Sequence, residues 1–131
     1  MAFLSSLSRG RFLGAIRSFH SSAFLHESIG VVGIPLSKGQ RKTGVDNGPD
    51  DLRDFGTLKA LTKYGWDVTD YGNLSFNVPE VESPSGNVKR SRTVGEATEA
   101  VADAVERALR ENDICLNLGG DHSLAIGTIS G

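Results

Sequence analysis

The sequence contains little that would cross-link, anchor or strongly charge a protein. Its single cysteine, Cys115, excludes an intramolecular disulfide and argues against a secreted, disulfide-stapled fold. No apolar run approaches the roughly 20 residues that cross a bilayer. A net charge of −2 gives no reason to expect nucleic acid or an anionic membrane as a partner. With 131 residues, 38% of them hydrophobic, we expect one small soluble domain or one piece of a larger domain.

Acidic residues are missing from residues 1–26, which contain three arginines and six serines; the first carboxylate is Glu27. An N-terminus rich in Arg and Ser and free of acids is typical of a mitochondrial transit peptide. A helix between Arg11 and Phe19 would gather apolar side chains on one side and arginines on the other. We therefore predict that residues 1–26 are a transit peptide, disordered or amphipathic and outside the fold, which directs the chain to the mitochondrial matrix. The alternative is an uncleaved tail.

After residue 26, strand and helix patterns alternate. Short apolar, β-branched runs predict strands that are buried on both faces. Thr93 and Glu96 fit a capping box at the start of the second helix, and Gly65 suits the end of the first. This order predicts an α/β fold with a parallel sheet. The expected strands are 29–34, 66–71 and 114–118, and the expected helices are 49–64, 93–111 and 124–131.

His122 is the best candidate for a functional residue. It lies in the turn Gly119-Gly120-Asp121-His122-Ser123, directly after a predicted strand. The carboxyl ends of parallel strands are where ligands bind in open α/β sheets. A neutral imidazole is the commonest transition-metal ligand, and Asp121 and Ser123 could orient it. On spacing alone, a solvated loop histidine is the alternative.

The cationic loop 37–48 follows another predicted strand and should therefore face the same edge as His122. Its cations could bind an anion, but its glycines match neither phosphate-binding motif, so a nucleotide-binding module is the weakest interpretation. A solvated charged loop is the alternative. Asp67 and Asp70 are expected to pair with nearby lysines at the surface, and Cys115 is expected to be a small core residue.

Taken together, several segments resemble the N-terminal portion of a mitochondrial-type arginase, a ureohydrolase with a Rossmann-like three-layer fold. They are IGVVGIP at 29–35, SKGQ at 37–40, GVDNGP at 44–49, DYG at 70–72, RTVG at 92–95 and LGGDHSLAIG at 118–127. The GGDHS turn is shared with agmatinases, whereas SKGQ and SLAIG favour arginase.

The resemblance implies hydrolysis of L-arginine to L-ornithine and urea, as in the urea cycle, at two manganese ions. It implies that His122 ligates one of these ions, with Asp121 and Ser123 in support, and that the full-length enzyme assembles as a homo-oligomer, a trimer in the family. No nucleic acid or membrane partner is implied.

The chain departs from the family pattern because the Asp-x-His-x-Asp and later Asp-x-Asp segments, which carry the other metal ligands, do not occur in it. We therefore expect a fold truncated after the third strand and the start of the next helix, with a bare apolar sheet edge, and no activity from this chain alone. Three alternatives stay open: an active enzyme in the full-length product, a non-catalytic short product that associates with full-length subunits, and a related ureohydrolase such as agmatinase.

Overall fold

The computed structural model describes residues 2–5, 27–79, 81–87 and 89–131. The strands are β1 (Ala2–Ser5), β2 (Ser28–Ile34), β3 (Asp67–Asn73) and β4 (Ile114–Gly119). The α-helices are α1 (Gly48–Asp54), α2 (Thr57–Lys63), α3 (Ser91–Glu111) and α4 (Leu124–Ser130), and a 3₁₀ turn, η1, covers Val45–Asn47. Among the described helices, none combines the length and the apolar character needed to cross a membrane.

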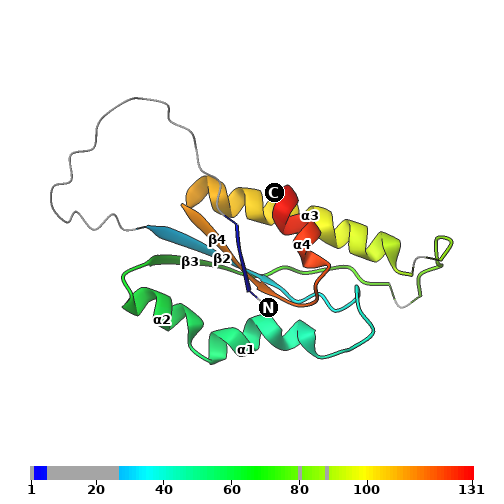
Figure 1. Cartoon of the computed structure of the whole chain (residues 1–131), viewed down its shortest axis with the longest axis horizontal. Helices are drawn as coiled ribbons and strands as arrows, with labels where there is room; N and C mark the ends of the chain where they lie inside the picture. Colours follow the sequence, from blue (N-terminus) through cyan, green and yellow to red (C-terminus); the bar gives the residue numbers. More distant parts are fainter. Residues whose placement is uncertain (1, 6–26, 80, 88) are drawn as a thin grey trace.

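The strands form one sheet in the order β1-β4-β2-β3, in which β2 runs parallel to both β3 and β4. Helices α1 and α2 cover one face of the sheet, and α3 and α4 cover the other (Figure 1). Because the three parallel strands point the same way, their carboxyl ends meet at one edge. The predicted three-layer α/β architecture is confirmed.

The central strand β2 is buried on both faces, as its apolar run predicts. Val32 and Ile34 pack with the apolar face of α3, and Val31 packs on the opposite side with Leu116 and Leu118 of β4. Each of these five side chains is at most 8% exposed. The core therefore consists of two layers separated by the sheet, which fixes the positions at which β2 and β4 end.

The predicted helix 49–64 is two helices. Gly56 adopts the left-handed backbone conformation, with φ of 97°, and separates α1 from α2. The break turns Phe55 out to solvent, with 89% of its surface exposed, although its spacing predicts a buried position. Leu58 and Leu61 do pack against the sheet, so the apolar pattern is correct on both sides of a break that it does not reveal.

The predicted capping box is wrong. Helix α3 begins at Ser91, and Glu96 forms an ion pair with Arg92 at 2.8 Å instead of reaching back to Thr93. The carboxylate of Glu82, from the preceding loop, accepts hydrogen bonds from the backbone N–H groups of Arg92 (2.7 Å) and Thr93 (3.2 Å) and from the Thr93 hydroxyl. A carboxylate from the loop that precedes α3 therefore satisfies the orphan amides of the first turn.

Strand β1 lies inside the segment that we expected to stay outside the fold. Ala2–Ser5 pairs antiparallel with β4, from Ala2 opposite Leu118 to Ser5 opposite Cys115. The edge of β4 that we expected to be bare is therefore covered, because its outer row of backbone groups has found hydrogen-bond partners. The amphipathic helix predicted between Arg11 and Phe19 lies outside the described residues.

Candidate functional site

The turn that follows β4 is held by the buried carboxylate of Asp121, which is 2% exposed. Its Oδ2 accepts a hydrogen bond from the Gly39 backbone N–H at 2.7 Å. Its Oδ1 accepts from both the backbone N–H and the hydroxyl of Ser123, at 2.9 and 2.5 Å. One side chain therefore ties the loop after β2 to the turn that contains His122.

The backbone of the same turn is fastened to the end of β2. The Asp121 N–H donates to the Leu36 carbonyl at 2.7 Å, and the Gly120 N–H donates to the Ile34 carbonyl at 3.4 Å. A Cβ at Gly120 would lie 2.5 Å from the Ile34 oxygen, far inside contact distance. Only glycine permits this close approach of two backbone segments.

The loop and the start of α1 close against the turn from the other side. A Cβ at Gly39 would lie 2.5 Å from Ser123 Oγ, and one at Gly48 would lie 2.6 Å from the Gly119 carbonyl oxygen. The expectation that the loop 37–48 faces the same edge as His122 is confirmed.

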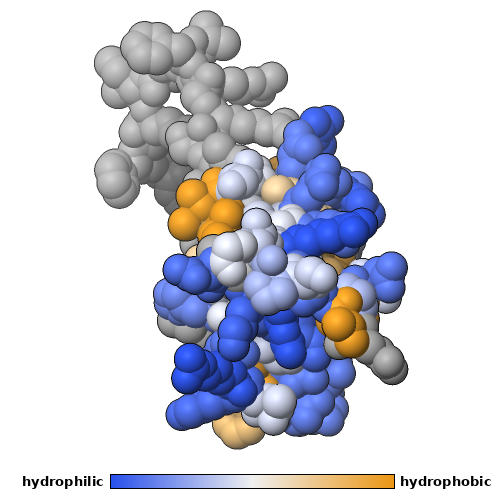
Figure 2. Space-filling view, turned by 90° about the vertical axis from the view of Figure 1, so that its right-hand side faces the viewer, coloured by the Kyte–Doolittle hydropathy of each residue, from blue (hydrophilic) through white to orange (hydrophobic). Residues whose placement is uncertain are grey.

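His122 itself is an exposed residue of this turn, and its carbonyl accepts a hydrogen bond from the Ala125 N–H at 3.2 Å as α4 begins. The face toward which the parallel strands point is largely hydrophilic (Figure 2). Across the described parts of the chain, no group of three or more His, Cys, Asp or Glu side chains could hold a metal ion. Because hard divalent cations need several oxygen ligands, this arrangement does not hold a manganese pair by itself. The assignment of His122 as a metal ligand, supported by Asp121 and Ser123, stays a prediction.

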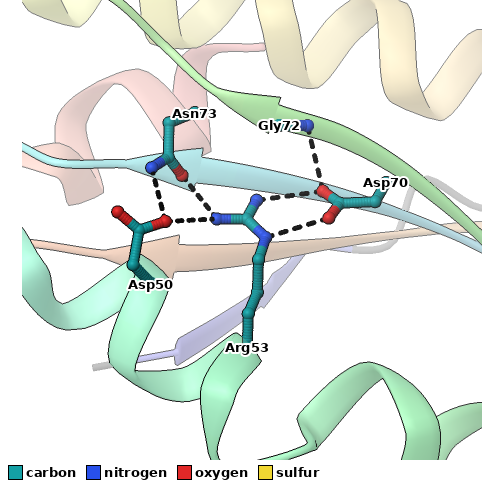
Figure 3. A network of polar contacts seen from close by, with 5 residues as sticks. All are labelled: Asp50, Arg53, Asp70, Gly72 and Asn73. Atoms are coloured by element: carbon teal, nitrogen blue, oxygen red, sulfur yellow. Dashed lines mark hydrogen bonds and ion pairs between the residues drawn. The ribbon is translucent and has the colours of Figure 1, made fainter.

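A second polar cluster at this edge was not predicted from the sequence (Figure 3). Arg53 of α1 donates from Nε and Nη2 to the two carboxylate oxygens of Asp70, both at 2.9 Å. Its Nη1 donates to the Asn73 side-chain oxygen at 2.5 Å, and the Asn73 amide donates to Asp50 at 2.8 Å. The expected pairing of Asp70 with a lysine is therefore wrong. The guanidinium lies over Gly33 of β2, whose missing side chain leaves room for it.

Electrostatics favour the charged forms of this pair. Burial alone would raise the pKa of the Asp70 carboxyl, but the hydrogen bonds from Arg53 and the Gly72 N–H and the guanidinium charge outweigh burial, so the pKa lies below its usual value. The hydrogen bond to Asp70 raises the pKa of Arg53. The pair anchors α1, whose first residue Gly48 abuts the turn, to the last residues of β3.

A cavity of about 430 Å³ lies beside the loop that follows β2. Lys38, which precedes Gly39, lines it together with Val78, Pro79, Val81, Glu82, Arg90 and Thr93, whereas His122 is not among the lining residues. The cavity is therefore adjacent to the turn and separate from it.

Comparison with known proteins covers the part of the chain that contains these features. The model of the arginase family matches residues 27–131. The chain belongs to the arginase family. The arginase-1 of Oryctolagus cuniculus is 51% identical over 105 residues, which are 80% of this chain and 33% of that protein. The mitochondrial arginase-2 of Rattus norvegicus is 49% identical over 79% of this chain and 30% of its own length.

Solved arginases have the same fold as this chain. The native arginase of Bacillus caldovelox superposes with a TM-score of 0.71 at 34% identity, over 79% of this chain and 35% of that structure. The Entamoeba histolytica arginase, solved in complex with L-ornithine, gives 0.67 at 26% identity, over 79% of this chain and 35% of that structure. The chain spans about a third of the length of the family members that it matches.

Proposed function

We propose that the Gly119–Ser123 turn supplies one metal ligand, His122, to the active site of an arginase-type hydrolase. The observation that carries this proposal is the Asp121 carboxylate, which joins the turn to the loop after β2 at the carboxyl edge of the sheet. The turn is held to the loop and to the end of β2 by the Asp121 side chain and by the backbone N–H groups of Gly120 and Asp121. Folding therefore sets the location of His122 before any ligand binds. Membership of the arginase family supplies the chemical context.

The reaction that we propose for the complete enzyme is the manganese-dependent hydrolysis of L-arginine to L-ornithine and urea. The names of the related arginases and the L-ornithine complex of the Entamoeba protein support this substrate. Because the described residues do not fit a manganese pair, the remaining ligands would come from sequence that these 131 residues do not contain. We therefore infer that this chain is inactive alone.

Within that enzyme, this chain's residues would act by positioning. Asp121 fixes the turn, and the Ser123 hydroxyl donates a hydrogen bond to its carboxylate. Gly39, which has no side chain, lets the loop after β2 lie close to Ser123. The Arg53–Asp70 pair holds α1, and through Gly48 the turn, against the sheet.

The test compares three proteins: this chain, the chain extended by its downstream coding sequence, and the extended chain with His122→Ala. Each is incubated with Mn²⁺ and L-arginine, and urea release and bound manganese are measured. We expect no urea from the short chain and release from the extended one. We expect His122→Ala to weaken manganese binding by more than the roughly 10–100-fold that loss of a ligand-orienting group costs.

Asp103→Asn, on the exposed face of α3, is the control and should bind manganese normally. Urea from the short chain that disappears in His122→Ala would contradict its inactivity. Unchanged manganese content in extended His122→Ala would contradict the ligand role. Agmatine in place of arginine separates the arginase proposal from an agmatinase, because agmatine lacks the carboxylate.

A non-catalytic role is the second candidate, because the residues that the structure describes contain no group of three or more side chains that could hold a metal ion. In that case the short chain would associate with full-length subunits, which assemble as homo-oligomers in this proposal, and co-purification of a tagged short chain with the extended one would detect it.

For localisation, we propose the mitochondrial matrix, on the composition of residues 1–26 and the similarity to a mitochondrial arginase-2. A fluorescent reporter fused to residues 1–26 should enter mitochondria, and a cytosolic reporter would contradict this.

A further inference from the structure

The cavity beside the loop after β2 has no part in the proposed hydrolase site. Its volume of about 430 Å³ lies within the range of small-molecule sites, which is about 300–1,000 Å³. Its described lining has an apolar side, a carboxylate, a hydroxyl and two cations, contributed by Val78, Pro79 and Val81, by Glu82, by Thr93, and by Lys38 and Arg90. An apolar wall with a few polar groups suits a small ligand that is charged at one end.

The two cations reach the cavity from segments that are far apart in the sequence. Lys38 belongs to the loop after β2, and Arg90 immediately precedes α3. Neither side chain forms a hydrogen bond or an ion pair with another residue that the structure describes. Two positive charges that converge on one cavity favour an anionic ligand there.

The carboxylate of the lining limits the charge of that ligand. Glu82 accepts hydrogen bonds from the backbone N–H groups of Arg92 and Thr93. The hydrogen bond from the Thr93 hydroxyl lowers the pKa of the Glu82 carboxyl, so this group is negatively charged at neutral pH. Two positive charges and one negative charge leave one positive charge in the described lining, which matches a monoanion better than a dianion.

The cavity lies away from the place at which the longer family members would continue. Its described lining comes from the loop after β2, from the segment between β3 and α3, and from the start of α3, and includes nothing from β4 or α4. Gly131 lies against Ala102, about three helical turns along α3 from its start (Figure 1). β3 ends the described sheet with exposed Asp67 and Asp70, and such charges protect an edge strand from further pairing.

We propose that this cavity binds a small organic monoanion, a carboxylate with a short apolar tail, whose charged end lies at Lys38 and Arg90. A guanidinium matches a carboxylate in two-point geometry, and an ammonium adds a compact positive charge. The apolar tail would contact the side formed by Val78, Pro79 and Val81. The proposal concerns binding alone and does not depend on the hydrolase activity.

The test titrates the extended chain and the short chain with isovalerate, a branched five-carbon carboxylate, at neutral pH without added metal ion. Calorimetry measures the affinity, and nuclear magnetic resonance follows the amides of Gly39, Val81 and Thr93. We expect saturable binding to both chains with a Kd on the order of 1 mM, as suits a ligand of this size. Isovaleramide, which is the neutral analogue, and sulfate, which is a dianion, should each bind more weakly by about tenfold or more.

Two substitutions remove the cations one at a time. Lys38→Gln and Arg90→Asn should each weaken isovalerate binding by about tenfold. Asparagine is chosen because Arg90 has a φ of 58° and asparagine tolerates this left-handed conformation. Lys59→Gln, at an exposed lysine of α2, is the matched control and should bind like the parent.

Several results would overturn the proposal. Unchanged binding in both cation variants would show that the anion does not lie at these residues, and equal binding of isovaleramide or sulfate would show that the cavity does not select a monoanion. Binding that disappears in His122→Ala would place the anion at the turn instead. Binding by the short chain alone would show that further sequence fills the cavity.

Discussion

Removal of the Asp121 carboxylate tests the contact on which the candidate site depends. Asp121→Ala deletes the acceptor for three donors, which are the Gly39 N–H, the Ser123 N–H and the Ser123 hydroxyl. A hydrogen bond to a charged group contributes about 1.5–3 kcal/mol to stability. The three do not add fully, because Gly39 is exposed and Ser123 is half-buried, so water can replace part of what is lost. We expect a loss of about 2–4 kcal/mol in the free energy of unfolding.

Such a loss is large for a small domain, whose total stability is about 5–15 kcal/mol. Urea unfolding followed by the fluorescence of Trp66 would measure it, because Trp66 is the single tryptophan and packs against the core. Asp121→Asn should cost less, since one acceptor oxygen remains, although its amide would place N–H groups against the Gly39 donor. Asp103→Ala, on the exposed face of α3, is the control and should change stability by less than about 0.5 kcal/mol. A cost for Asp121→Ala no larger than this control would refute the reasoning.

Two further predictions follow from the pKa shifts. The lowered pKa of Asp70 means that its ion pair with Arg53 stabilises the fold above about pH 4, where Asp is charged in the unfolded chain, and that this contribution is lost as the pH falls through the folded-state pKa. Asp70→Asn should therefore reduce stability at neutral pH and reduce the loss on acidification; parallel acid-unfolding curves for the two proteins would contradict this. Burial raises the pKa of the Cys115 thiol to about 11, so at pH 8 only about one thiol in a thousand is the reactive thiolate. A disulfide reagent should label Cys115 only when the chain opens, and rapid labelling of the folded protein would contradict its burial.

The strands β2 and β4 could be predicted from the sequence because burial on both faces requires continuous apolar runs. For the same reason their carboxyl ends, and hence the positions of His122 and the loop 37–48, could be assigned to one edge. Helix α3 could be predicted because Ala97, Val101 and Ala108 repeat at helical spacing, and it ends at Glu111, near where the sequence predicted.

The features that were missed depend on contacts between distant residues. Thr93 and Glu96 have the local pattern of a capping box, but the loop carboxylate of Glu82 satisfies the same amides. The partner of Asp70 in strand β3 is Arg53, 17 residues away in helix α1, and the space for that pair comes from Gly33 on a third element. Pairing of β1 with β4 joins residues more than a hundred positions apart, which no local pattern encodes.

The carboxylate shared by Gly39 and Ser123 also has a thermodynamic consequence. Because the two segments bind the same side chain, the loop after β2 and the turn with His122 cannot shift independently. If an ion bound at His122 favours one arrangement of the turn, it must favour the matching arrangement of the loop, and linkage makes this coupling reciprocal. Any molecule that orders the loop should then tighten ion binding by the same factor by which the ion tightens the binding of that molecule.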